Sequence, residues 1–151
     1  MDEHTVQVRK IIAEAGWAVQ GVFATEPGHV NFAYTVGLTE RRLPELIATG
    51  AFRIEFLATL LNAAAPLDIT DDRTEVALPG SGDDAGEVVV RVRPVTAAHS
   101  TFGLGMARRM FGQHRVRAVQ LLWPSDDGIY PDDAAWPLVL HGPQPLLPPR
   151  G

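Results

Sequence analysis

Apolar residues recur at helical spacing in three segments of the chain. In the first segment the positions i, i+3, i+4 and i+7 are occupied by Val8, Ile11, Ile12 and Ala15. Such a stripe is typical of an amphipathic helix that buries one face. Residues 54–64 repeat the pattern, and residues 100–111 carry a weaker version in which Gly103 and Gly105 each cost roughly 1 kcal/mol relative to alanine. The pattern therefore predicts three helices.

Short runs of β-branched and aromatic residues lie between the helical segments. They cover residues 17–24, 30–36, 45–49, 87–94 and 116–123. Turn residues at positions 26–29 join the first two runs and predict a hairpin. Val88, Val90 and Val92 alternate with polar neighbours, which predicts a strand near a sheet edge. Residues 66–86 are rich in Asp, Pro, Gly and Ser and are predicted to form a connection ending in a mobile loop.

The order of these segments determines the fold class that we expect. Strands and helices do not alternate regularly, so an α+β domain with a mostly antiparallel sheet and about three helices fits better than a doubly wound one. A small, partly closed barrel is the alternative. A chain of 151 residues is long enough for one domain, which we place at residues 1–147, with residues 148–151 as a flexible tail.

Composition excludes several classes of protein. The chain has no cysteine, so disulfides, thiolate metal sites and a cysteine nucleophile are absent. A formal net charge of −5 disfavours nucleic acid and anionic membranes as partners. No apolar run reaches the 18 residues that a membrane span needs, and the acidic start at residues 1–4 does not resemble a secretory signal. We expect a cytoplasmic protein.

Three polar residues in two predicted strands are the first candidates for chemistry. Tyr34 and Thr35 are adjacent in a strand, so their side chains point to opposite faces and one hydroxyl can line a pocket. Packing at the rim is the alternative. Glu45 follows Pro44 and precedes an apolar strand, where burial can raise its pKa and make it a base. A structural role, through an ion pair with Arg41 or Arg42 or through backbone donors, is favoured.

A basic cluster near the last predicted helix is the second candidate. It consists of Arg108, Arg109, His114, Arg115 and Arg117. Arginines without an intervening acid can hold a phosphate, a carboxylate or a nucleotide. The competing interpretation is a solvated helix end beside a sheet edge.

Aromatic residues flank a polar loop late in the chain. Trp123, Tyr130 and Trp136 surround Asp127 and Gly128. Such a group can stack on a flat ligand or bind a partner, and it can equally cap the core. The five histidines lack metal-site spacing, and no nucleophilic-serine motif or complete dinucleotide fingerprint occurs. We therefore predict no metal and no cofactor.

Three ordered patches carry a family resemblance. They are residues 16–22, residues 32–40 followed by 44–46, and residues 119–124 followed by Asp127-Gly128, Pro131 and a late Gln144. With these patches the chain resembles domain-of-unknown-function family 4262, small bacterial and phage proteins. The resemblance implies no established reaction. One departure is that Asp132 and Asp133 follow Pro131 where the family has an aromatic residue, which leaves the role of this loop open.

The sequence thus favours a non-catalytic ligand-binding or protein-interaction domain, because no complete catalytic set can be assembled. We expect its cleft near residues 123–136, and near Arg108 and Arg109. The partner is a protein or a small anionic ligand, and self-association is left open. The alternative is an enzyme or a flavin or nucleotide binder, with Glu45 or His114 as acid or base and the two arginines as an anion clamp.

Overall fold

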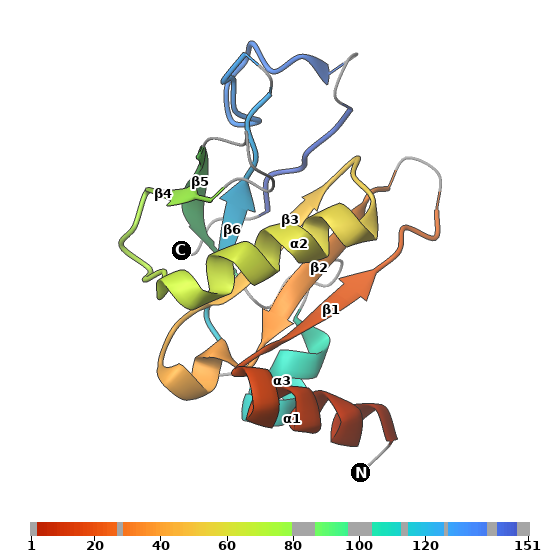
Figure 1. Ribbon diagram of the computed structural model, residues 1–151. Helices are drawn as coiled ribbons and strands as arrows, with labels where there is room; N and C mark the ends of the chain where they lie inside the picture. The colour runs from red at the N-terminus through yellow and green to blue at the C-terminus, as the bar shows by residue number, and fades with distance from the viewer. Residues whose placement is uncertain are drawn as a thin grey trace.

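A six-stranded open sheet forms the centre of the computed structural model, which describes residues 3–26, 29–79, 87–96, 104–112, 115–125, 127–138 and 142–147 (Figure 1). Within these residues the strand order is β1-β2-β3-β6-β5-β4. Neighbouring strands are antiparallel except for β3 and β6, which are parallel. The strands are β1 (Ala18–Val22), β2 (Asn31–Val36), β3 (Glu45–Gly50), β4 (Glu75–Leu78), β5 (Val88–Val95) and β6 (Ala118–Leu122).

Three α-helices accompany the sheet in the described residues. They are α1 (Glu3–Ala15), α2 (Ile54–Ala64) and α3 (Gly105–Phe111). Two 3₁₀ turns, η1 (Leu38–Arg41) and η2 (Ala65–Leu67), follow β2 and α2. The predicted α+β class with a mostly antiparallel sheet is confirmed. The sheet is not closed, because β1 and β4 lie at opposite edges, so the barrel alternative is wrong. Residues 148–151, the expected tail, lie outside the described residues.

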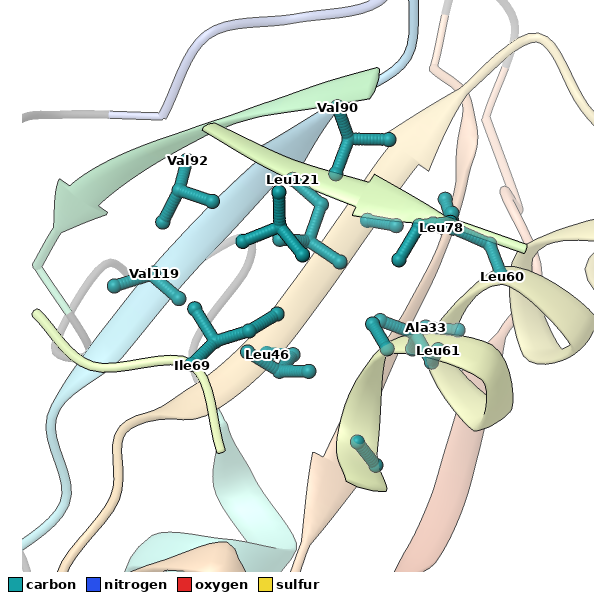
Figure 2. Close-up of a cluster of buried hydrophobic side chains, with 14 of the residues drawn as sticks. Ala33, Leu46, Leu60, Leu61, Ile69, Leu78, Val90, Val92, Val119 and Leu121 are labelled. Carbon is teal, nitrogen blue, oxygen red and sulfur yellow. The ribbon is translucent and has the colours of Figure 1, made fainter. Parts of the chain in front are cut away.

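Helix α2 covers one face of the sheet. Figure 2 shows Leu60 and Leu61 among the strand residues of this core. Together with Leu57 they are buried against strand residues that share one alternation. These strand residues are Ala33, Leu46, Ala48, Val90, Val92, Val119 and Leu121. Burying a side chain of this size contributes about 1.5–3 kcal/mol. Helix α2 has the bounds that its periodicity predicted, because all its apolar positions find a partner.

Helices α1 and α3 lie on the other face. Their buried residues Val8, Met106 and Phe111 pack with the strand residues of opposite alternation, among them Tyr34 and Ile47. Only part of the predicted stripe of α1 is covered. Val8 is buried, but Ile11 is 38% exposed and Ala15 is exposed. Helix α3 begins at Gly105, and residues 97–103, where its predicted start falls, lie outside the described residues.

The largest error of the sequence interpretation is strand β4. It lies inside residues 66–86, for which the composition predicts a connection and no strand. Its alternation is only four residues long, so it gives little signal. Val76 and Leu78 point into the core while Glu75 and Ala77 are exposed. Strand β5, predicted near an edge, is therefore second from the edge, with β4 outside it.

Candidate functional site

Glu45 is the first residue of β3 and lies against the η1 turn that follows β2. Its side chain is 0% exposed. The carboxylate accepts five hydrogen bonds. Oε1 accepts from Thr35 Oγ1 at 2.8 Å and Leu38 N at 3.2 Å, and Oε2 accepts from Gly37 N at 3.2 Å, Thr39 N at 2.9 Å and Thr39 Oγ1 at 2.6 Å. These are the backbone donors that the sequence left as one alternative, and Arg41 instead pairs with Asp68 at 2.7 Å.

The local sequence explains why a carboxylate is needed at this position. The first N–H groups of a helical turn have no partner inside the turn. The η1 turn has no side-chain cap of its own, so Glu45 supplies the missing acceptor from the next strand. Gly37 adopts φ 127°, and a Cβ there would lie 3.1 Å from the Gly16 carbonyl oxygen. Thr35 completes the arrangement because its Oγ1 also accepts from Leu46 N at 2.8 Å.

Electrostatics at Glu45 reflect two opposing causes. Burial raises the pKa of the carboxyl above its ordinary value, and the hydrogen bonds from Thr39, Thr35 and Gly37 oppose that shift. A general base must reach a substrate proton with a free lone pair. Two carboxylate oxygens offer about four lone-pair sites, and five donors already use them. Glu45 therefore acts as an internal cap that joins β3 to η1.

Tyr34 lies beside this cap on the face that carries α3. Its hydroxyl oxygen accepts a hydrogen bond from Met106 N at 3.1 Å. Burial raises the pKa of the phenol, and the nearby positive charge of Arg109 lowers it. Tyr34 thus fixes the start of α3, and it is 4% exposed.

The predicted basic cluster divides in the structure. Arg108 and Arg109 lie in the last turn of α3. Arg117 precedes β6, pairs with Asp71 and donates to the carbonyl oxygen of Arg42 at 2.9 Å. His114, the other candidate acid or base, lies outside the described residues. The described part of the chain gathers no three His, Asp or Glu side chains that could hold a metal ion.

The aromatic candidates lie beyond the other end of β6. Trp123 meets Phe56 of α2 edge-on with ring centroids 5.0 Å apart. Trp136 donates from Nε1 to the carbonyl oxygen of Gly142 at 3.0 Å, and Asp127 is exposed. Trp123 lines a cleft of about 360 Å³ together with residues that include Tyr130. Arg117 precedes β6 and Trp123 follows it, so these basic and aromatic candidates lie at opposite ends of the strand. They do not form one site.

Two glutamines fasten the segment 142–147 to β6, a role that sequence reasoning missed. Gln144 pairs with both backbone groups of Trp123, through Oε1 at 2.7 Å and Nε2 at 2.9 Å. Gln120 of β6 in turn forms hydrogen bonds to the backbone of this segment. Its Nε2 donates to the Pro145 carbonyl oxygen at 2.6 Å and its Oε1 accepts from Leu147 N at 2.9 Å. The side-chain amides replace the backbone pairing of a strand, so no periodic pattern signals it.

A groove along the open edge of β1, which we call the β1 groove, is the second feature that the sequence did not reveal. It has a volume of about 410 Å³. Its lining comes from three elements: Trp17, Ala18, Val19 and Gly21 at β1, Ile11 and Ala15 of α1, and Ile54, Ala58 and Asn62 of α2. Trp17 Nε1 donates to Asn62 Oδ1 at 2.9 Å, which holds the indole in place. The apolar stripe of α1, which is only partly buried, is the sequence feature that could have indicated this groove.

The fold and this geometry define a small α+β domain whose buried polar groups serve its own architecture. Comparison with protein families assigns it more closely. The family model described as a domain of unknown function (DUF4262) matches residues 11–137. The chain belongs to this family, as the resemblance indicated. Neither the curated proteins nor the solved structures contain a match to the chain.

Proposed function

We propose that this chain is a non-catalytic protein-interaction domain that binds an extended polypeptide segment along β1. The observation that carries the proposal is an open strand edge beside an apolar groove. An edge strand presents backbone N–H and C=O groups to a new strand, and adjoining pockets take its alternate side chains. In the described sheet β2 is the only neighbour of β1, and the β1 groove lies at the free side.

The opposite edge of the sheet supports this choice by contrast. Strand β4 carries Glu75 and is preceded by Asp72 and Arg73, and charged side chains protect an edge against pairing. Strand β1, Ala-Val-Gln-Gly-Val, carries no charge. Like β1 itself, the residues that line the β1 groove are uncharged. A neutral apolar partner segment therefore fits β1 and does not fit β4.

The state of Glu45 supports the non-catalytic part. The most deeply buried carboxylate in the described residues is saturated by donors of its own fold. Its side chain is 0% exposed, so a substrate does not reach it. No helix among the described residues is long and apolar enough to cross a membrane. The cysteine-free sequence suits a reducing compartment, and we place the protein in the cytoplasm.

Selection of random peptides displayed on phage tests the proposal. We expect binders whose apolar residues occupy alternate positions. Ala58→Glu, which puts a charge into the β1 groove, should abolish their binding, because Ala58 lines the groove. Thr59→Glu is the matched control on the same helix, since Thr59 is exposed and outside the lining. Binders that ignore Ala58→Glu, or an empty selection, would count against the proposal.

A second pocket favours a small anionic ligand as the other candidate. It has a volume of about 490 Å³, within the range of small-molecule sites, and its lining includes His29, Arg53, Asn31 and Phe52. A ligand at 100 times its dissociation constant stabilises the folded state by about 2.7 kcal/mol. A rise in the thermal midpoint with phosphate or nucleotides, lost in Arg53→Ala, would support this candidate. A midpoint indifferent to the whole panel would remove it.

A further inference from the structure

We infer that the polypeptide bound along β1 is a second copy of this chain, paired antiparallel about a two-fold axis through Gln20. The inference rests on the proposed function, because it names the occupant of the same edge. A two-fold interface brings one surface patch against itself, so the patch must be self-complementary in shape and charge. The segment around β1 has that property.

The segment from Trp17 to Phe23 is complementary to itself in side-chain size when it is reversed about Gln20. It reads Trp-Ala-Val-Gln-Gly-Val-Phe. In the antiparallel register centred on Gln20, Trp17 faces Phe23 of the second copy, Ala18 faces Val22, and Val19 faces Gly21. A large residue therefore meets a small one at the inner positions, and two aromatic rings meet at each end. Aromatic cross-strand pairs contribute roughly 0.2–1 kcal/mol each relative to alanine pairs.

Phe23 is largely exposed in a single copy. Its side chain is 66% exposed, the highest value among the large apolar residues of the described chain. Trp17 and Val19 both pack on the α2 side. Phe23 directly follows β1, and pairing that extends the strand by one residue would place its side chain on the same face, because side chains alternate along a strand. In the two-fold pair, Phe23 of the second copy reaches the β1 groove next to Trp17. The groove of about 410 Å³ offers it an apolar lining.

Charge is compatible with this occupant. The chain carries a formal net charge of −5, so contact between two copies sets like charges together unless the contact surface is neutral. Strand β1 and the lining of the β1 groove contain no charged residue.

Glycine at position 21 also shapes the groove, because a Cβ there would lie 2.8 Å from Ile54 Cγ2. Gly21 keeps α2 close to β1, which gives the groove its wall.

Sedimentation analysis of the full-length chain is the first test. We expect a species of twice the 16.4 kDa chain mass. Phe23→Asp should weaken association by roughly 30-fold or more, the loss expected of an aromatic hot spot. Ala77→Asp, on the exposed face of β4, is the matched control and should leave association unchanged. A wild-type chain that stays monomeric, or a dimer that persists in Phe23→Asp, overturns the inference.

Site-directed crosslinking tests the register. Directly opposed residues in antiparallel strands have Cα atoms about 4.5–5.5 Å apart, within the range of a disulfide. The chain contains no cysteine, so Gln20→Cys introduces a single thiol. Under mild oxidation it should give a covalent dimer, whereas Ala77→Cys should not. Equal crosslinking of both variants, or none at position 20, contradicts the pairing.

The peptide of residues 16–25 separates this inference from the function on which it rests. Monomeric Phe23→Asp retains its own β1 groove and should bind that peptide, and Ala58→Glu should not. If the chain is monomeric and ignores this peptide but binds selected peptides through the β1 groove, the inference fails and the proposed function stands. If no peptide depends on the β1 groove, both fail.

Discussion

The Glu45 cap and the open edge of β1 differ in whether their polar groups are paired within the fold. At Glu45, two threonine hydroxyls and three backbone N–H groups converge on one carboxylate that is 0% exposed. At β1, one side of the strand lies beside an apolar groove and has no neighbouring strand in the described sheet. The contrast teaches that the site richest in polar chemistry stabilises the fold, while the chemically plain edge is the surface available to a partner.

Removal of the Glu45 carboxylate should have the largest effect on stability. Glu45→Ala leaves five donors without an acceptor, and because each buried donor without a partner costs about 1–3 kcal/mol we expect a loss of several kcal/mol. The free energy of unfolding from urea denaturation measures this loss. Glu40→Ala, an exposed change in the same turn, is the control and should stay within about 0.5 kcal/mol of wild type. A Glu45→Ala protein as stable as Glu40→Ala would show that the cap is dispensable.

Thr35→Val should have the next largest effect. The substitution keeps the shape but removes a donor to Glu45 and the acceptor of Leu46 N. Hydrogen bonds to charged groups contribute about 1.5–3 kcal/mol, and a buried N–H without a partner adds to the loss. We expect a loss of about 2–3 kcal/mol by urea denaturation. In a Glu45→Ala background the same change should cost less, and full additivity would contradict the coupling.

Gln144→Ala tests whether segment 142–147 belongs to the domain. It removes the partner of both backbone groups of Trp123, and an unsatisfied buried group costs about 1–3 kcal/mol. Hydrogen exchange should accelerate at Trp123 and Leu147 while α2 stays protected. Unchanged exchange at both residues would mean that the side-chain amides do not hold this segment.

Phe23→Asp should leave the free energy of unfolding nearly unchanged, whereas Glu45→Ala lowers it. Phe23 is 66% exposed, so its replacement should alter the free energy of unfolding of the isolated chain by at most about 0.5 kcal/mol. Thermal denaturation at low protein concentration measures this. A loss of several kcal/mol would mean that Phe23 packs within its own chain and does not serve association.

The pH dependence that Glu45 contributes should be the smallest and most specific effect. Because its pKa is raised above the ordinary 4.5, the folded state binds the proton more tightly than the unfolded state. Its contribution to stability is therefore full below pH 4.5 and falls as pH rises through the folded pKa. The difference in unfolding free energy between wild type and Glu45→Gln should follow that slope. A pH-independent difference would contradict the raised pKa.

Sequence patterns predicted best the element whose apolar positions all find partners. Helix α2 matched its periodicity because each of its buried residues meets the sheet. Strand β4 escaped prediction because four alternating residues among polar ones carry little signal. The sequence offered Glu45 as a base or a structural residue, and only the position of η1 against β3 shows which donors reach it. The β1 groove depends on the strand order, which periodicity does not encode.

Association of two variants measured side by side tests the central claim most directly. Sedimentation equilibrium should show that Glu45→Gln, at a temperature where it is folded, retains the wild-type association constant. Phe23→Asp, which is as stable as wild type, should lose association. Association that survives Phe23→Asp but disappears in folded Glu45→Gln would contradict the account, because it would make the buried cap the working site and the β1 edge irrelevant.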